Sequence, residues 1–336
     1  MENVFEINGN PLSGLDYRFE NYVSQKKAFN NKHMDGNGLP NYAYKMDYEH
    51  RKHLDSIPGL MRAVKTYCAT IIPQQLQTYN MQGVMVGPNQ FPEIYKMVTE
   101  CANTLGIGIP NVLIVPNIGG EEFNAVTYAL DDIEPLILVT GLMVERMSSE
   151  QLKAIIAHEC GHIHNQHGLY GVLENIITMV GSVGLASIPG INLIAPLLTS
   201  GVRYAVDMWS RAAEVTADRA AVICAGSPKI AGSALAKFMY NGANISGVVE
   251  SEINLEPLRE QLDMMLNNPN RLNELFSTHP LPLKRIFAVH DFAECEVFYN
   301  WRPDLKKAGQ TLYTKEQTDE KCKKYIDVVM PKGAKK

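Results

Sequence analysis

At residues 158–162 the chain reads His158-Glu159-Cys160-Gly161-His162. The two histidines stand four residues apart, so on a helix they share one face and can bind one metal ion together. Glu159 can reach a water on that metal as a general base. Upstream, Ser148 and Gln151 have the spacing of a capping box, and a mostly apolar segment, 152–157, leads into the motif. The stretch therefore predicts a buried helix that carries a metal site.

A hydrolytic metal site of this kind needs a third protein ligand and one open position for water. A third histidine six residues after His162 is absent, because that position is Gly168. His164 and His167 lie close by but out of register with the pair. We interpret these two histidines as solvated residues at the end of the helix, and we expect the third ligand on another element.

The best candidate lies in the segment 210–221, which is rich in alanine and reads as a helix. Glu214 and Asp218 stand four residues apart on one face of it. They could form a solvent-facing ladder of ion pairs with neighbouring arginines, but the alanines favour tight packing against another helix. A buried carboxylate pair needs a partner, and a metal is a good one. We therefore predict Glu214 as the third ligand and Asp218 as the hydrogen-bond acceptor that orients a ligand histidine.

An H-E-x-x-H motif followed by E-x-x-x-D on a second helix resembles the gluzincin pattern. The sequence resembles the family of HtpX-like proteases and CAAX prenyl proteases in the stretches AIIAHECGHIHNQH and SRAAEVTADRAA. Further likeness lies in EEFNAVTYAL and in the block Ser277-Thr278-His279-Pro280, which Arg285-Ile286 follows. The resemblance runs from about residue 46 to 290.

The resemblance implies a mainly helical, zincin-type α+β fold that binds one zinc ion per chain. In it His158, His162 and Glu214 would bind Zn2+, and Glu159 would activate the water. Asp218 would not bind the zinc itself but would hold a ligand histidine in position.

The resemblance also implies that Asn124 and Ala125 lie on an edge strand that pairs with an extended substrate. The residues agree, because 123–130 and 136–140 read as strands joined by a turn at 131–135. We expect a small antiparallel sheet whose edge strand borders the active-site helix. A substrate added as a strand would be held mainly by its main chain. An alternative for Asn124 is a strand-end residue that bonds its own backbone.

His279 has three interpretations. It could stabilise the negative charge that develops on the scissile carbonyl oxygen, or it could bind zinc as a fourth ligand and keep the enzyme idle. It could also simply precede a helix, because Pro280 suits a first helical turn.

Composition limits the class of protein. The 336 residues carry 31 basic and 36 acidic side chains, for a net charge of −5, and no basic stripe appears, so we expect no nucleic-acid partner. The six cysteines, which show no C-x-x-C spacing, indicate reduced thiols in a reducing compartment. The N-terminus is acidic and has no apolar core, so we expect no signal peptide. These features favour a cytoplasmic protein.

The uncharged segment 175–202 is long enough to cross a bilayer. A single crossing would put the motif histidines and Glu214 on opposite sides of the membrane, and two crossings need about forty residues. With Pro189-Gly190 near its middle, the segment predicts a broken helical hairpin, buried in the protein or touching a membrane surface. The alternative location is therefore the cytoplasmic face of a membrane.

We divide the chain into an unassigned segment 1–45, a metallopeptidase domain 46–290 and a C-terminal extension 291–336. The predicted function is a zinc endopeptidase that cuts internal bonds of extended or unfolded polypeptides. The alternatives are a zinc-bearing protein that only binds, against which the intact Glu159 argues, and a zinc amidase or aminopeptidase. For an aminopeptidase, Glu121-Glu122 could hold the substrate amine. The sequence leaves the oligomeric state open.

Overall fold

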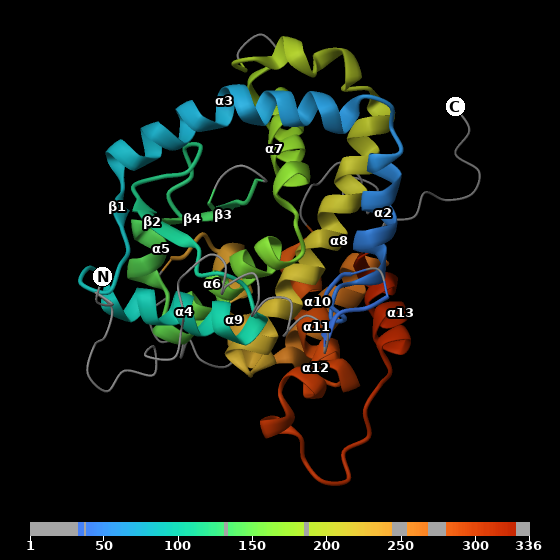
Figure 1. Cartoon of the computed structure of the whole chain (residues 1–336). Helices are drawn as coiled ribbons and strands as arrows, with labels where there is room; N and C mark the ends of the chain where they lie inside the picture. Colours follow the sequence, from blue (N-terminus) through green and yellow to red (C-terminus); the bar gives the residue numbers. More distant parts are fainter. Residues whose placement is uncertain are drawn as a thin grey trace.

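The computed structural model describes residues 33–36, 38–130, 134–184, 188–243, 254–267 and 280–326. It is mainly helical, with one small sheet (Figure 1). The helices before the sheet and beside it are α2 (Lys45–Asp55), α3 (Leu60–Gln82), α4 (Pro92–Leu105), α5 (Gly141–Arg146), α6 (Ser149–His164) and α7 (Gly168–Val183). The later α-helices are α8 (Ser200–Ala225), α9 (Pro228–Met239), α10 (Leu255–Leu266), α11 (Pro282–Phe292), α12 (Glu296–Trp301) and α13 (Lys315–Ile326). The short 3-10 helices are η3 (Ile191–Leu193), η4 (Ala195–Leu197) and η6 (Pro303–Leu305). The mainly helical α+β fold class is confirmed.

The sheet has four strands in the order β1-β2-β4-β3. Their bounds are β1 (Val84–Met85), β2 (Asn111–Val115), β3 (Ala125–Tyr128) and β4 (Leu136–Thr140). The β3–β4 and β1–β2 pairs are antiparallel, as expected, but β2 and β4 are parallel, so the sheet is mixed. All five β4 residues are buried, and pairing on both edges satisfies the backbone of such a strand. β3 is therefore left at the edge.

The centre of the molecule is the contact between α6 and α8 (Figure 1). The capping box starts α6 as predicted, because the Ser148 hydroxyl accepts from the Gln151 backbone and the Gln151 side chain accepts from the Ser148 backbone. Gly161 then allows the helices to approach closely. A Cβ placed on it would lie 2.8 Å from the Cβ of Ala220 and 3.0 Å from the Cα of Ala217. Ala217 and Ala220, two of the alanines predicted to pack α8 against another helix, therefore face α6.

The uncharged segment 175–202 is broken, as predicted, between α7 and α8 (residues 185–187 lie outside the described part). Gly190 takes a left-handed conformation, with φ of +68°, and η3 and η4 follow it. The break packs on α3, since Ile71 lies beside Gly190, and it buries Ile194 while leaving Leu193 exposed. In the part of the chain that the structure describes, no helix combines the length and apolar character that a membrane crossing requires.

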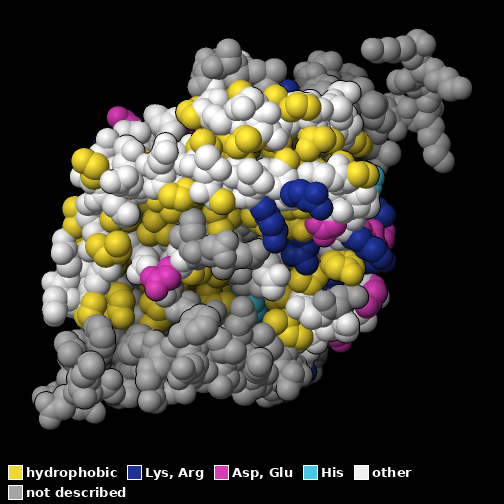
Figure 2. Space-filling model, turned by 45° about the horizontal axis from the view of Figure 1, so that its top comes forward, with side chains coloured by type: hydrophobic (Ala, Val, Ile, Leu, Met, Phe, Trp, Pro, Cys, Tyr) yellow, Lys and Arg dark blue, Asp and Glu magenta, His cyan; other side chains and the backbone are white. Residues whose placement is uncertain are grey.

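Charged side chains on the face drawn in Figure 2 do not form a band. Lys and Arg side chains gather in one small group there, while hydrophobic side chains are spread among polar ones.

Gly168 fixes the distance between α7 and β3. A Cβ at Gly168 would lie 1.7 Å from the carbonyl oxygen of Ala129, just after β3. We therefore expect Gly168→Ala to lower the free energy of unfolding by about 1–3 kcal/mol, the usual cost of forcing extra atoms into a packed site. Thermal unfolding followed by circular dichroism measures it.

The matched control is Gly171→Ala on the same helix, where a Cβ would meet nothing within 4 Å. That variant is expected to be neutral or stabilised by up to about 1 kcal/mol, because alanine favours helix over glycine. Equal melting temperatures for the two variants would contradict the close approach of α7 to β3.

Candidate metal centre

Helix α6 places His158 and His162 on one face, one turn apart. Their Nε2 atoms converge to 3.1 Å from each other. Both side chains lie deep in the molecule, His158 more so than His162. Two imidazole nitrogens aimed at one point are the arrangement that the H-E-x-x-H spacing predicts for shared binding of an ion.

Helix α8 brings Glu214 to the same point. One carboxylate oxygen of Glu214 lies 3.5 Å from Nε2 of His158, and the other lies 3.5 Å from Nε2 of His162. The three side chains offer ligand atoms that all lie within 4.8 Å of one another, the one such cluster found among the described residues. Two imidazoles and one carboxylate fit a divalent metal with a position left for water.

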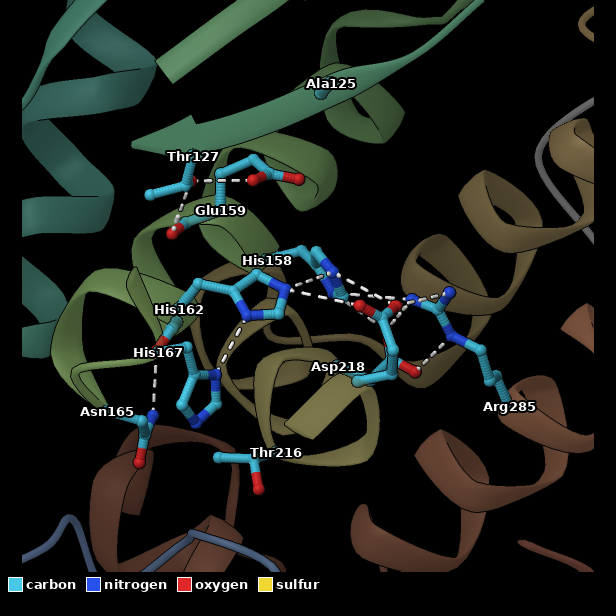
Figure 3. A network of polar contacts seen from close by, with 12 residues as sticks. Ala125, Thr127, His158, Glu159, His162, Asn165, His167, Thr216, Asp218 and Arg285 are labelled. Atoms are coloured by element: carbon cyan, nitrogen blue, oxygen red, sulfur yellow. Dashed lines mark hydrogen bonds and ion pairs between the residues drawn. The ribbon is translucent and has the colours of Figure 1, made fainter. Parts of the chain in front are cut away.

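Asp218 and Arg285 lie behind the histidines (Figure 3). Asp218 Oδ1 is 3.0 Å from His158 Nδ1, the nitrogen that faces away from the cluster. Arg285 donates to both oxygens of Asp218, at 2.8 and 2.7 Å, and its Nη1 lies 2.7 Å from Glu214. Burial works to raise the pKa of Asp218, but the charge and hydrogen bonds of Arg285 outweigh it and hold that pKa below its usual value.

All four charged residues of this part of α8, the pair Glu214 and Asp218 with Arg211 and Arg219, are buried. The alternative of a solvent-facing ion-pair ladder is therefore excluded. No role was predicted for Arg285; the only signal was its place in the Ser-Thr-His-Pro…Arg-Ile block.

Glu159 turns away from the cluster toward β3 (Figure 3). Its Oε2 accepts a hydrogen bond of 2.7 Å from the hydroxyl of Thr127. The same hydroxyl lies 3.1 Å from the Glu159 carbonyl oxygen. Thr127 is a contact that the sequence did not single out, because its pairing with Glu159 depends on how the strand lies over α6.

The edge of the sheet borders α6 at β3. The Asn124 carbonyl accepts from the Thr140 backbone N–H at 3.0 Å, so the backbone carbonyl of Asn124 faces β4. Backbone groups alternate in direction along an antiparallel strand, so those of Ala125 and Thr127 face the open side. The side chain of Asn124 is engaged locally: its oxygen accepts from Ala125 N at 2.8 Å, and its nitrogen donates to Glu121 at 2.7 Å.

His164 and His167 are not solvated, so this expectation was wrong. Both are buried, at 3% and 2% exposure. His164 Nδ1 lies 2.9 Å from the Tyr42 hydroxyl. His167 Nδ1 lies 2.9 Å from His162 Nδ1, and its Nε2 lies 2.9 Å from Asp47 of α2. Tyr42 and helix α2 cover the end of α6, and no local pattern in the sequence predicts this cover.

The remaining residues of interest from the sequence are the cysteines and His279. Cys160 is fully buried in the hydrophobic core and stands outside the ligand cluster. All six cysteines are free and buried. His279 lies outside the described residues.

Comparisons with known proteins agree with this site. The sequence model of peptidase family M48 matches residues 88–293. The plastoglobule-localized metallopeptidase 48 of Arabidopsis thaliana chloroplasts is 27% identical over 280 residues, which cover 80% of this chain and 76% of that protein. A protease HtpX homolog from Ralstonia nicotianae is 28% identical over 242 residues, covering 65% of this chain and 79% of its own length. Another HtpX homolog, from Thermococcus kodakarensis, is 27% identical over 250 residues with the same coverage.

No solved structure matches the chain significantly. The family model nevertheless spans more than half of the 336 residues and contains α6, α8 and all three residues of the cluster. The family and the relatives named metallopeptidase and protease imply a metal cofactor and polypeptide substrates. This chain belongs to peptidase family M48 and is a metallopeptidase.

Proposed function

We propose that this metallopeptidase is a zinc-dependent endopeptidase that cuts internal bonds of extended or unfolded polypeptides. One observation carries the proposal: the cluster of His158, His162 and Glu214 lies on α6 and α8 next to Glu159, and β3 offers an open edge above that glutamate (Figure 3).

Zinc is the proposed ion, because two histidines and one glutamate are a ligand set that zinc hydrolases use. The three residues would hold one ion per chain and leave a position free. When bound, zinc lowers the pKa of a water toward neutrality and polarises the substrate carbonyl.

Glu159 is proposed as the general base. Its carboxylate would accept a proton from the attacking water and pass that proton to the leaving amine. Thr127 donates to one oxygen of Glu159, which leaves the other oxygen available for the proton transfer. Asp218 would hold the His158 ring in the tautomer that presents Nε2 to the ion, with the charge of Asp218 balanced by Arg285.

Substrate is proposed to pair with the open edge of β3 through the backbone carbonyl of Ala125 and the backbone groups of Thr127. Binding of this kind requires an extended chain and gives weak sequence selectivity. Asn124 would act at the strand end, where its side chain already fixes the Ala125 backbone N–H. His279 keeps its three interpretations as oxyanion donor, fourth ligand or helix-start residue.

The aminopeptidase alternative has less support. It requires Glu121-Glu122 to hold a substrate amine, but the Glu121 carboxylate already accepts from Asn124. The binding-only alternative gives Glu159, which lies beside the ligand cluster, no function.

We further propose 46–290 as the catalytic unit and the cytoplasm as its location. The six free, buried cysteines support this location. Fractionation of cells that express the chain tests the location; recovery with membranes only would contradict it.

The test is digestion of casein, an unfolded protein, by the zinc-loaded enzyme, beside a tightly folded protein of similar size. We expect a ladder of internal fragments from casein, mapped by mass spectrometry, and little cleavage of the folded protein. Stepwise loss of residues from one end would instead establish an exopeptidase. Intact casein at full zinc occupancy would overturn the proposed activity.

A further inference from the structure

We infer that Asp47 and His167 form a positioning pair that sets the ring orientation and tautomer of His162, so that helix α2 is a working part of the metal centre. The inference rests on the proposed function, because it treats His162 as a metal ligand. Neither Asp47 nor His167 was singled out by sequence reasoning as a site residue.

The contacts form one unbroken chain of three side chains. His162 Nδ1, the ring nitrogen that faces away from the cluster, lies 2.9 Å from His167 Nδ1 (Figure 3). The other nitrogen of His167, Nε2, lies 2.9 Å from Asp47 Oδ2. Each link has the length of a good hydrogen bond.

The chemistry of these links allows one arrangement of protons when an ion is bound. A metal on Nε2 of His162 leaves the ring proton on Nδ1, which must donate to His167. His167 then accepts through Nδ1 and carries its own proton on Nε2. That proton points at Asp47, whose carboxylate can only accept. The order is therefore carboxylate, neutral imidazole, neutral imidazole, metal.

The pair is held rigidly. Asp47 is buried, and its second oxygen accepts from the indole N–H of Trp209 at 3.0 Å. The Trp209 ring also packs edge-on against His167, with ring centroids 5.5 Å apart. A buried, fully bonded network of this kind fixes the ring that it supports.

Further contacts hold Tyr42 and helix α2 against the end of α6. Arg51 donates to the Asn165 carbonyl at 2.7 Å. The Asn165 side chain donates to the Tyr42 hydroxyl at 3.0 Å and to the Gly161 carbonyl at 2.8 Å. Arg219 of α8 donates to the Tyr42 carbonyl at 3.0 Å. These contacts hold α2 where Asp47 can reach His167.

The two ligand histidines are thus supported in different ways. His158 is backed directly by Asp218, a carboxylate neutralised by Arg285. His162 is backed by a carboxylate only through a second histidine. Asp47 lies outside the residues that the family model matches, 88–293, so the support for His162 comes from helix α2, upstream of that match.

The test is the zinc affinity of full-length Asp47→Asn, measured by competition with a chromophoric chelator. An amide here cannot accept from both Trp209 and His167. If its nitrogen faces His167, the proton of that ring moves to Nδ1, and His162 is left protonated on Nε2, the atom that should bind zinc. We expect zinc to bind about 10–100-fold more weakly, the usual effect of losing such a supporting residue.

The matched control is Asp55→Asn, on the same helix, where an exposed carboxylate accepts from Tyr170. Its zinc affinity should equal that of the wild type. Melting temperatures of the zinc-free proteins separate an effect on zinc from an effect on folding.

A second variant separates positioning from general packing. His167→Phe keeps an aromatic ring at this position but removes both ring nitrogens. It should weaken zinc binding by about the same factor as Asp47→Asn. Because Asp47 acts on His162 only through His167, Asp47→Asn should add no further loss of zinc affinity in the His167→Phe background. Nitrogen-15 spectra of the zinc-loaded wild type should show the His162 Nδ1 and His167 Nε2 protons.

The outcomes distinguish this inference from the proposed function. If the wild type binds zinc and cuts casein while Asp47→Asn binds zinc equally well, or if the losses in the double variant simply add, the positioning pair is wrong and the endopeptidase stands. If the wild type binds zinc with the expected dependence on Asp47 but cuts nothing, the pair stands and the activity is wrong. Wild-type protein that holds no zinc would overturn both.

Discussion

Replacement of Glu159 by glutamine is expected to stop casein cleavage and leave zinc binding intact. The glutamine side chain has nearly the same shape, and its amide oxygen can still accept from the Thr127 hydroxyl, which lies 2.7 Å from the present carboxylate. It cannot take a proton from the attacking water. General acid–base groups contribute about 10²–10⁴-fold, so the rate of cleavage should fall by at least about 100-fold.

The control for this change is Glu150→Gln, the same substitution on an exposed glutamate in the first turn of α6. It should cut casein at the wild-type rate. Residual cleavage by Glu159→Gln within a few fold of the wild type would show that another group acts as the base.

Replacement of Glu214 by glutamine is expected to have the largest effect on metal binding. The neutral amide is a much poorer ligand for zinc than a carboxylate, and the site would keep only two ligands instead of the three that a hydrolytic zinc site needs. Affinity for zinc should therefore fall by more than the 10–100-fold typical of a supporting residue. Isothermal titration of zinc into the metal-free protein measures it, and casein cleavage should be lost at equimolar zinc.

The comparison variant is Glu174→Gln on α7, where the carboxylate accepts from Thr178 and stands outside the ligand cluster. It should bind zinc as the wild type does. Arg285 keeps both of its bonds to Asp218 when Glu214 is replaced, so the metal-free Glu214→Gln protein should stay folded. Zinc affinity within a few fold of the wild type would exclude Glu214 as the third ligand.

Much of the fold and the centre of the site were readable from local sequence. The capping box of Ser148 and Gln151 set the start of α6. The apolar, β-branched run 136–140 marked β4 at its observed bounds. The placement of Glu214 followed from the alanines around it, because small residues on a helix face predict close packing, and a carboxylate on that face needs a partner.

What escaped prediction depends on contacts between residues far apart in the chain. The order of strands depends on β4, which is fully buried and therefore needs a neighbouring strand on each side. Residues 123–140 alone do not indicate that β2 is one of these neighbours or that it runs parallel to β4. His167 looked like a solvated residue because it follows the last turn of α6. Its burial depends on Asp47, which lies 120 residues earlier, and on Trp209, neither of which carries a local signal.

The most direct test of the proposed zinc-dependent activity is a titration of the metal-free protein with zinc. The zinc occupancy of the protein and the rate of casein cleavage are followed in one sample. We expect cleavage to rise in proportion to bound zinc and to reach its maximum at one ion per chain. Full occupancy without internal cuts in casein, or cleavage that proceeds before zinc is added, would contradict it.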